Sequence, residues 1–183
     1  VLDVRQKDGN SKNFAMTGGV GGISSRLALE GPMFNDRGSF LVAGRGSYAH
    51  LLLKLSGEKN SVSFYDLNLK TNYSINDNNK LYLSGYFGRD VFNFDGSFSS
   101  SYGNTSGNLR WNHIFNDRLF SNLSLIYSNY DYELGIDDFE FDWVSSIRNY
   151  NAKYDFKYYL SDAFKLDFGI SAIKYEFNPG EIK

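Results

Sequence analysis

The amino-acid sequence predicts an all-β fold, an antiparallel up-and-down meander of about eight long strands. Three observations lead to this prediction: polar and apolar residues alternate over long stretches, polar Asn/Asp turns recur, and aromatic residues are abundant. The chain of 183 residues has 16 Phe and 14 Tyr but only two Pro. Aromatic residues suit the pleated surface of a strand, and alternation with a period of two gives a strand two unlike faces.

The expected strands follow one another with alternating short and longer connections. They cover residues 14–30, 39–55, 63–75, 80–94, 106–115, 118–131, 143–160 and 163–177. Tight polar turns are expected at 35–38, 76–79, 116–118 and 161–162, because Asn, Asp and Gly tolerate the left-handed backbone of hairpin turns. The longer connections lie near 56–62, 95–105 and 131–142, and from 178 onward.

Two stretches leave local alternatives open. The run AHLLLKL at 49–55 also fits a short helix. In the seventh strand the apolar residues Phe139, Phe141 and Trp143 have odd numbers, whereas the apolar set from Tyr150 onward is even. A β-bulge between the two sets would restore the phase.

Strand length points to a membrane. Several expected strands have about 15 residues and would span about 50 Å, against about 5–6 residues in most soluble sheets. Short turns at one end and longer loops at the other are typical of outer-membrane barrels. The sequence therefore predicts part of a transmembrane β-barrel in the outer membrane of a Gram-negative bacterium. A soluble all-β binding module with one face on a core explains the alternation equally well.

In a barrel wall the two faces meet lipid and a wet interior. The last hairpin would turn Tyr154, Phe156, Phe168 and Ile170 to outer-membrane lipid. The residues expected to face the interior are Asp66, Asn68, Lys70, Arg110, Lys153, Asp155, Lys157, Lys165 and Asp167.

Composition excludes several classes of function. The chain has no Cys, a net charge of −2 and a pI near 5.7, so disulfides, thiolate metal sites and nucleic-acid partners are not expected. His50 and His113 lie far apart in sequence, and SGEK at 56–59 falls in an expected loop without the other motifs of serine penicillin-recognising enzymes. We expect no enzyme activity, no catalytic residue and no cofactor.

One acidic connection is a candidate cation site. Its six carboxylates could supply the oxygen ligands that calcium prefers, although their spacing matches no known calcium loop. They are Asp131, Glu133, Asp137, Asp138, Glu140 and Asp142. A solvated acidic loop is the alternative.

Four stretches carry a resemblance to a known family. VLDVRQKDGN at 1–10 resembles the last plug strand of TonB-dependent outer-membrane receptors, and 26–48 resembles the first barrel hairpin of such receptors of the Bacteroidetes, SusC-related type. KLYLSGYFGRD at 80–90 and NLRWNHIF at 108–115 resemble later barrel strands of that group. The resemblance implies active nutrient uptake energised by the TonB complex through a plugged barrel.

The resemblance also divides the chain. Residues 1–13 would be the end of the plug and a linker, and 14–183 a partial barrel of about eight strands. The partners it implies are the TonB energising complex, a surface lipoprotein of the SusD type and a small-molecule, glycan or peptide substrate. A self-contained eight-stranded barrel with a structural or adhesive role is the alternative.

Overall fold

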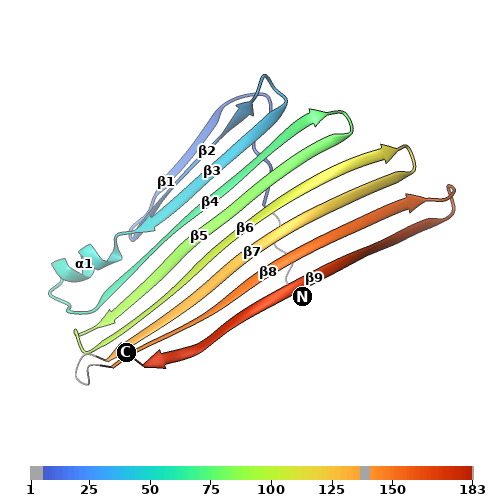
Figure 1. Ribbon diagram of the computed structural model, residues 1–183. Helices are drawn as coiled ribbons and strands as arrows, with labels where there is room; N and C mark the ends of the chain where they lie inside the picture. Colours follow the sequence, from blue (N-terminus) through green and yellow to red (C-terminus); the bar gives the residue numbers. More distant parts are fainter. Residues whose placement is uncertain (1–5, 137–140, 183) are drawn as a thin grey trace.

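The computed structural model describes residues 6–136 and 141–182. They form one open sheet in which nine strands lie in sequence order and each pairs antiparallel with the next (Figure 1). The strands are β1 Ala15–Val20, β2 Ser24–Met33, β3 Gly38–Ser47, β4 Ser61–Asn76, β5 Asn79–Phe94, β6 Phe98–Asn116, β7 Leu119–Ile136, β8 Phe141–Tyr159 and β9 Lys165–Ile182. The predicted all-β meander is confirmed, with nine strands in place of eight.

The additional strand arises near the N-terminus. The expected first strand, 14–30, is a hairpin of β1 and β2, in which the Gly21 amide donates to the Ser24 carbonyl at 2.8 Å. Glycine reverses the chain without steric cost, so the run GGVGG at 18–22 permits a turn where the hydrophobic pattern suggested continuity.

The prediction that a strand covers 39–55 is wrong in its second half. Strand β3 ends at Ser47, and Ala49–Leu55 forms the short helix α1, as the alternative reading proposed. The Ser47 hydroxyl accepts a hydrogen bond from the Ala49 amide, and Ala, Leu and Lys favour helix. In the part of the chain that the structure describes, no helix is both long and apolar enough to cross a membrane.

The longer connections are shorter than expected. Only residues 95–97 separate β5 from β6, with positive φ at Asp95 and Gly96, and β7 continues to Ile136 where a loop was expected from 131. These serine-rich and acidic stretches lack the usual apolar alternation, yet their main chain pairs fully with the neighbouring strands. Strands β6 and β8 consequently reach 19 residues each.

The connections define two ends of the sheet. The turns β2–β3, β4–β5, β6–β7 and β8–β9 gather at one end, called the turn end here, and the turns β1–β2 and β5–β6 and helix α1 lie at the opposite end, called the loop end (Figure 1). The first of these turns contains three consecutive positive-φ residues, Phe34, Asn35 and Asp36.

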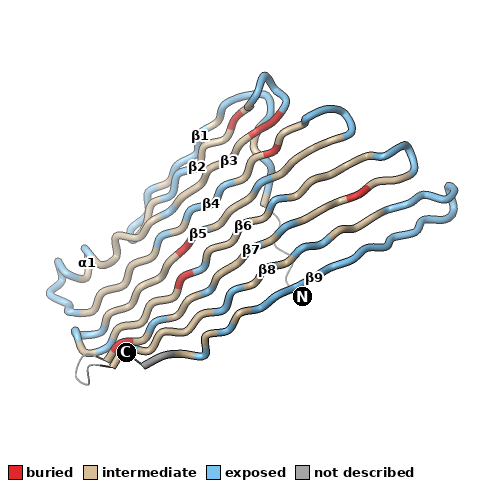
Figure 2. The backbone as a smooth tube through the Cα atoms, viewed as in Figure 1, coloured by how far each residue is buried: buried red, intermediate tan, exposed pale blue. Residues whose placement is uncertain are grey.

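The sheet has almost no core of its own. Among the described residues Leu41 is the one buried hydrophobic residue, and most of the backbone is half-buried or exposed (Figure 2). Large apolar side chains remain open, with Ile170 74% and Phe177 68% exposed. Burial of apolar surface is the main favourable term in folding, so both faces of this sheet require partners.

Candidate functional site

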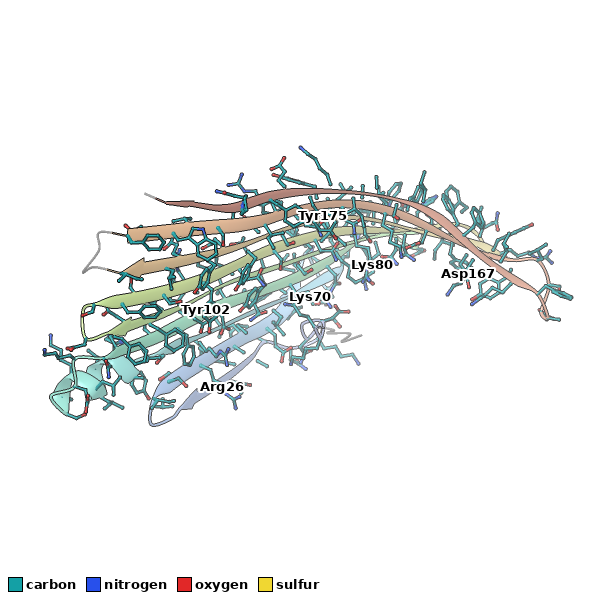
Figure 3. The ribbon with its side chains drawn as sticks, turned by 90° about the horizontal axis from the view of Figure 1, so that it is seen from below. Arg26, Lys70, Lys80, Tyr102, Asp167 and Tyr175 are labelled. Atoms are coloured by element: carbon teal, nitrogen blue, oxygen red, sulfur yellow. The ribbon has the colours of Figure 1, made fainter. Side chains whose placement is uncertain are left out.

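The functional candidates are the two faces of the curved sheet (Figure 3). Because side chains alternate along each strand and the register pairs Lys70 with Ser84, Ser84 with Asn108, and Ser124 with Lys153, residue parity assigns each side chain to a face. Face A carries Leu67, Leu83 and Leu125, and face B carries Lys70, Arg110 and Lys153.

All nine residues predicted to face a wet interior lie together on face B. They are Asp66, Asn68, Lys70, Arg110, Lys153, Asp155, Lys157, Lys165 and Asp167. Several are paired on that face: Lys153 with Asp155 and Lys165 with Asp167, each at 2.9 Å, and Arg45 with Asp66. The four residues predicted to face lipid, Tyr154, Phe156, Phe168 and Ile170, share face A.

Face A carries an apolar band that begins at the turn end. In β7 it runs from Leu119 to Tyr127 and in β8 from Tyr158 to Tyr150, or about 30 Å along each strand. Its other members are Leu27, Leu29, Phe40, Val42, Tyr65, Leu67, Leu69, Tyr73, Leu81, Leu83, Phe87, Leu109, Trp111, Phe115, Leu123, Leu125, Ala152, Tyr154, Phe156, Leu166, Phe168, Ile170 and Ala172. Thr71, His113 and Ser121 interrupt it.

Aromatic rings mark both limits of the apolar band. At the turn end Phe156 stacks between Phe115 and Phe168, with ring centroids 6.4 and 5.1 Å away. At the limit toward the loop end, Tyr65 lies 5.9 Å from Phe87 and Tyr127 lies 5.3 Å from Tyr150. Rings therefore occupy both borders of the band, and its middle is mainly aliphatic, with Trp111 and Tyr154 beside Leu123.

Beyond the apolar band face A becomes charged. Arg89 in β5 reaches across β6 to β7, where its guanidinium lies 2.9 Å from Glu133 and 3.5 Å from Asp131. Gly103 stands between Arg89 and Asp131 in the register and leaves room for this contact. In β9 the Lys174 ammonium donates to Glu176 at 2.6 Å, and this hydrogen bond and charge lower the pKa of Glu176.

On face B the polarity along the strands is reversed. Its polar residues occupy the turn end and the middle, whereas its loop-end part is aromatic and aliphatic. That part carries Val62, Phe64, Tyr86, Phe92, Phe94, Phe98, Tyr102, Tyr130, Tyr132, Leu134, Trp143, Ile147, Ile173, Tyr175 and Phe177. Burial, followed by the charge of Asp90, raises the pKa of the Tyr102 phenol. Apolar and polar character thus exchange faces partway along the strands.

The exchange of apolar residues between the two faces explains why the apolar residues of β8 have odd numbers at its start and even numbers from Tyr150 onward. The β7–β8 ladder is unbroken from Leu119–Tyr158 to Ile136–Phe141, so the bulge expected there is absent from that pairing. Phe141 and Trp143 lie on face B and Tyr150 on face A. A register irregularity does occur at Val144/Ser146, but it lies in the pairing with β9 and does not alter which face these residues occupy.

The predicted calcium site is only partly within the described residues. Asp131 and Glu133 lie in β7 and bind Arg89, and Asp142 lies in β8, whereas Asp137, Asp138 and Glu140 fall outside the described residues. Within residues 6–136 and 141–182 no group of three or more potential ligands could hold a metal ion. The calcium site stays a prediction.

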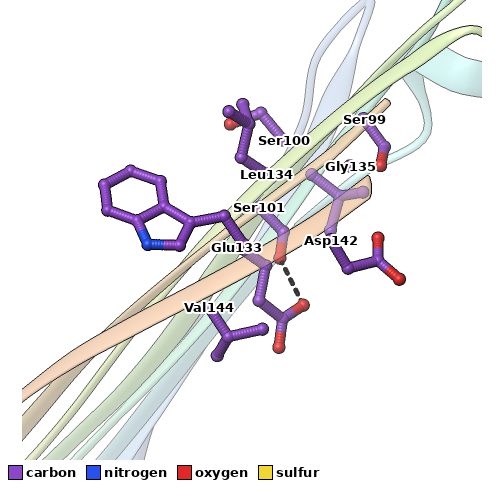
Figure 4. Close-up of a pocket in the computed structure, with 10 residues that line it drawn as sticks. Ser99, Ser100, Ser101, Glu133, Leu134, Gly135, Asp142 and Val144 are labelled. Carbon is purple, nitrogen blue, oxygen red and sulfur yellow. Dashed lines mark hydrogen bonds between the residues drawn. The ribbon is translucent and has the colours of Figure 1, made fainter. Parts of the chain in front are cut away.

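A shallow hollow of about 330 Å³ lies beside these carboxylates (Figure 4). The Ser101 hydroxyl donates to Glu133 at 3.0 Å, and the small residues Ser99 and Gly135 also line the hollow. Arg89 and Ser101 already bind the Glu133 carboxylate. We therefore do not assign a ligand to this hollow.

His113 and Ser56 both contact neighbouring groups of the fold. His113 is on face A between the rings of Trp111 and Phe115, and its Nδ1 lies 2.8 Å from Asn79 Oδ1. Ser56 of the SGEK stretch follows α1, and its hydroxyl donates to the Leu52 carbonyl. Each of these two side chains therefore has a structural partner.

Fold and faces together define a class: an open wall of long antiparallel strands with an apolar band on one face and a polar surface behind it. No family model matches the chain, and no curated protein matches it.

Proposed function

We propose that the chain forms part of the wall of a transmembrane β-barrel in the outer membrane of a Gram-negative bacterium, with face A toward lipid. The observation that carries this proposal is the apolar band on face A with aromatic rings at both limits. Outer-membrane barrels have an outward apolar band about 25 Å tall between two aromatic girdles, and about 9–11 residues cross it in each tilted strand.

The charged residues beyond the apolar band support the same orientation. If face A packed on a soluble core, its apolar residues would continue along the paired strands to the loop end. Instead the charged residues of face A lie at or beyond the border marked by Tyr65–Phe87 and Tyr127–Tyr150. They include Arg89, Asp131, Glu133, Arg148, Lys174 and Glu176. Charges at this position suit the lipid headgroups and the water beyond them, because charged groups are costly only within the hydrocarbon.

The wider role we propose is active nutrient uptake energised by the TonB complex. It rests on the sequence resemblance at 1–10, 26–48, 80–90 and 108–115. The chain would bind and pass its substrate, a small molecule, glycan or peptide, without chemical conversion, and a SusD-type lipoprotein is the surface partner that the resemblance implies. Loss of uptake in a strain that lacks the gene, restored by the gene, tests this role.

The two tryptophans allow a direct test of the wall. Trp111 lies in the apolar band on face A, and Trp143 lies at the loop end on face B. We would refold Trp143→Phe and Trp111→Phe into phospholipid vesicles, so that each variant reports one tryptophan. The measurement is the quenching of fluorescence by lipids with brominated acyl chains, relative to unbrominated vesicles.

We expect strong quenching of Trp111 and little quenching of Trp143. Each variant is the control for the other, because both have one indole in the same sheet. Equal quenching of the two, or stronger quenching of Trp143, contradicts the proposed orientation. A chain that remains folded and monomeric in water without detergent contradicts the membrane wall altogether.

A further inference from the structure

A short extended segment crosses face B before the first strand begins. Residues 6–10, called the strap here, lie over β2, β3 and β4 at the level of Glu30, Phe40 and Lys70. The strap is not part of the sheet: within residues 6–13 no main-chain hydrogen bond joins it to a strand. Its attachment therefore depends on side chains.

Lys70 provides the first attachment. Its ammonium lies 2.9 Å from the Asp8 carboxylate and donates to the Gln6 carbonyl at 2.5 Å. The Lys70 side chain is only 15% exposed beneath the strap, and the strap supplies polar partners for this largely covered cation. Beside it, the Gln6 amide donates to Asn68 Oδ1 at 2.9 Å.

Glu30 provides the second attachment, with the charges reversed. Its carboxylate accepts the Lys7 ammonium at 2.8 Å through one oxygen and the Asn10 main-chain amide at 3.1 Å through the other. The Glu30 side chain is 18% exposed, whereas Lys7 is 69% exposed. The sheet thus contributes one base, Lys70, and one acid, Glu30. The strap contributes the oppositely charged partner of each.

Gly9 allows the strap to lie flat against the sheet. A Cβ atom at this position would collide with the Phe40 carbonyl group of β3. Any larger residue would lift the strap and lengthen the contacts of Lys70 and Glu30, because main-chain atoms of a paired strand cannot move aside cheaply.

We propose that residues 6–10 are a detachable strap, that face B of β2–β4 is its docking site, and that Lys70 and Glu30 are the two anchors. Ion pairs with exposed partners weaken as salt screens them, whereas the main-chain ladder of the sheet does not. The strap should therefore leave while the sheet stays folded, exposing both anchors on face B. This inference does not depend on lipid contact by face A.

Limited trypsin digestion of the full chain in detergent micelles measures the release. Cleavage after Lys7 reports an open strap, and cleavage after Lys12, which lies outside the strap, is the internal reference. We expect Lys70→Met and Glu30→Gln each to raise the relative rate of cleavage after Lys7 about fivefold at low salt, the upper range for such pairs. Added 1 M NaCl should raise it in the wild type and much less in these variants.

Two further variants separate the strap from general destabilisation. Gly9→Ala should release the strap without removing a charge, and Lys153→Met, which breaks an ion pair elsewhere on face B, should leave cleavage after Lys7 unchanged. Circular dichroism must show the same β signal in every variant. Equal cleavage after Lys7 in the wild type, Lys70→Met and Gly9→Ala, independent of salt, overturns the proposal. The tryptophan-quenching experiment tests lipid contact by face A and does not depend on whether the strap detaches.

Discussion

Tyr127 and Tyr150 face each other across β7 and β8 on face A, with their rings 5.3 Å apart. On the turn side, the next pair on this face is Leu125 and Ala152, and on the loop side it is Asn129 and Arg148. The tyrosine pair therefore separates apolar from polar surface within one pair of strands. Tyrosine suits such a border because its ring is apolar and its hydroxyl is polar.

Charge at the centre of the apolar band should be far more costly than charge on the opposite face. We expect Leu123→Arg to lower the free energy of unfolding in phospholipid vesicles by about 2–4 kcal/mol, the range for arginine at the bilayer midplane. Ser124→Arg, one residue later and on face B, should cost less than about 1 kcal/mol. Urea titration followed by circular dichroism measures both. Equal costs would contradict the assignment of lipid to face A.

The buried hydroxyls of Ser39 and Ser121 should differ in their contribution to stability. Ser39 Oγ accepts the Asn72 amide at 2.7 Å, and Ser39 is 1% exposed. Ser39→Ala leaves that amide without a partner and should cost about 1–3 kcal/mol. Ser121 is also buried, but its Oγ has no hydrogen-bond partner among the described residues, so Ser121→Ala should be neutral or slightly stabilising. The same urea titration in detergent micelles distinguishes them, and similar losses would show that the Ser39–Asn72 contact contributes nothing specific.

The two faces could be predicted from sequence wherever they differ strongly. In β4 and β9 the residues around Lys70 and Asp167 alternate with leucine and phenylalanine, and the structure puts each set on one side. Period-two alternation determines which residues share a face, because a strand cannot present neighbours to the same side. It does not determine what covers either face.

The loop-end part of the sheet could not be predicted in the same way. There the aromatic residues, such as Tyr130 and Tyr132, change to the opposite face, so a continuous strand looks like a break in phase or a loop. The serines at 99–101 and the acids Asp131 and Glu133 reinforced that interpretation. The usable signal was the shift of aromatic residues to even positions in three successive strands, at 92–94, 98–102 and 130–132. Arg89 was missed because its partners lie two strands away.

Two glycines should respond differently to alanine. A Cβ at Gly38 would collide with the Asn72 carbonyl of the neighbouring strand, whereas a Cβ at Gly107 would meet no atom within 4 Å. Gly38→Ala should lower the free energy of unfolding by about 2 kcal/mol, because the start of β3 must move away from β4. Gly107→Ala should be neutral or stabilising, since alanine restricts the unfolded chain. Chemical denaturation of both variants measures this, and a tolerated Gly38→Ala would mean that β3 and β4 do not approach so closely.

The ion pair between Arg89 and Glu133 should contribute a modest but measurable coupling energy to the stability of the sheet. Both side chains are partly exposed, at 31% and 49%, so a double-mutant cycle with Arg89→Met and Glu133→Gln should give about 0.5–1 kcal/mol. The more exposed pair Lys174 and Glu176 provides the comparison and should couple more weakly.

Because Gly103 leaves the space through which Arg89 crosses β6, Gly103→Val should abolish the coupling between Arg89 and Glu133 and leave that between Lys174 and Glu176 intact. Sodium chloride at 1 M should reduce both couplings by screening. A coupling between Arg89 and Glu133 that survives Gly103→Val would mean that the guanidinium reaches β7 by another path.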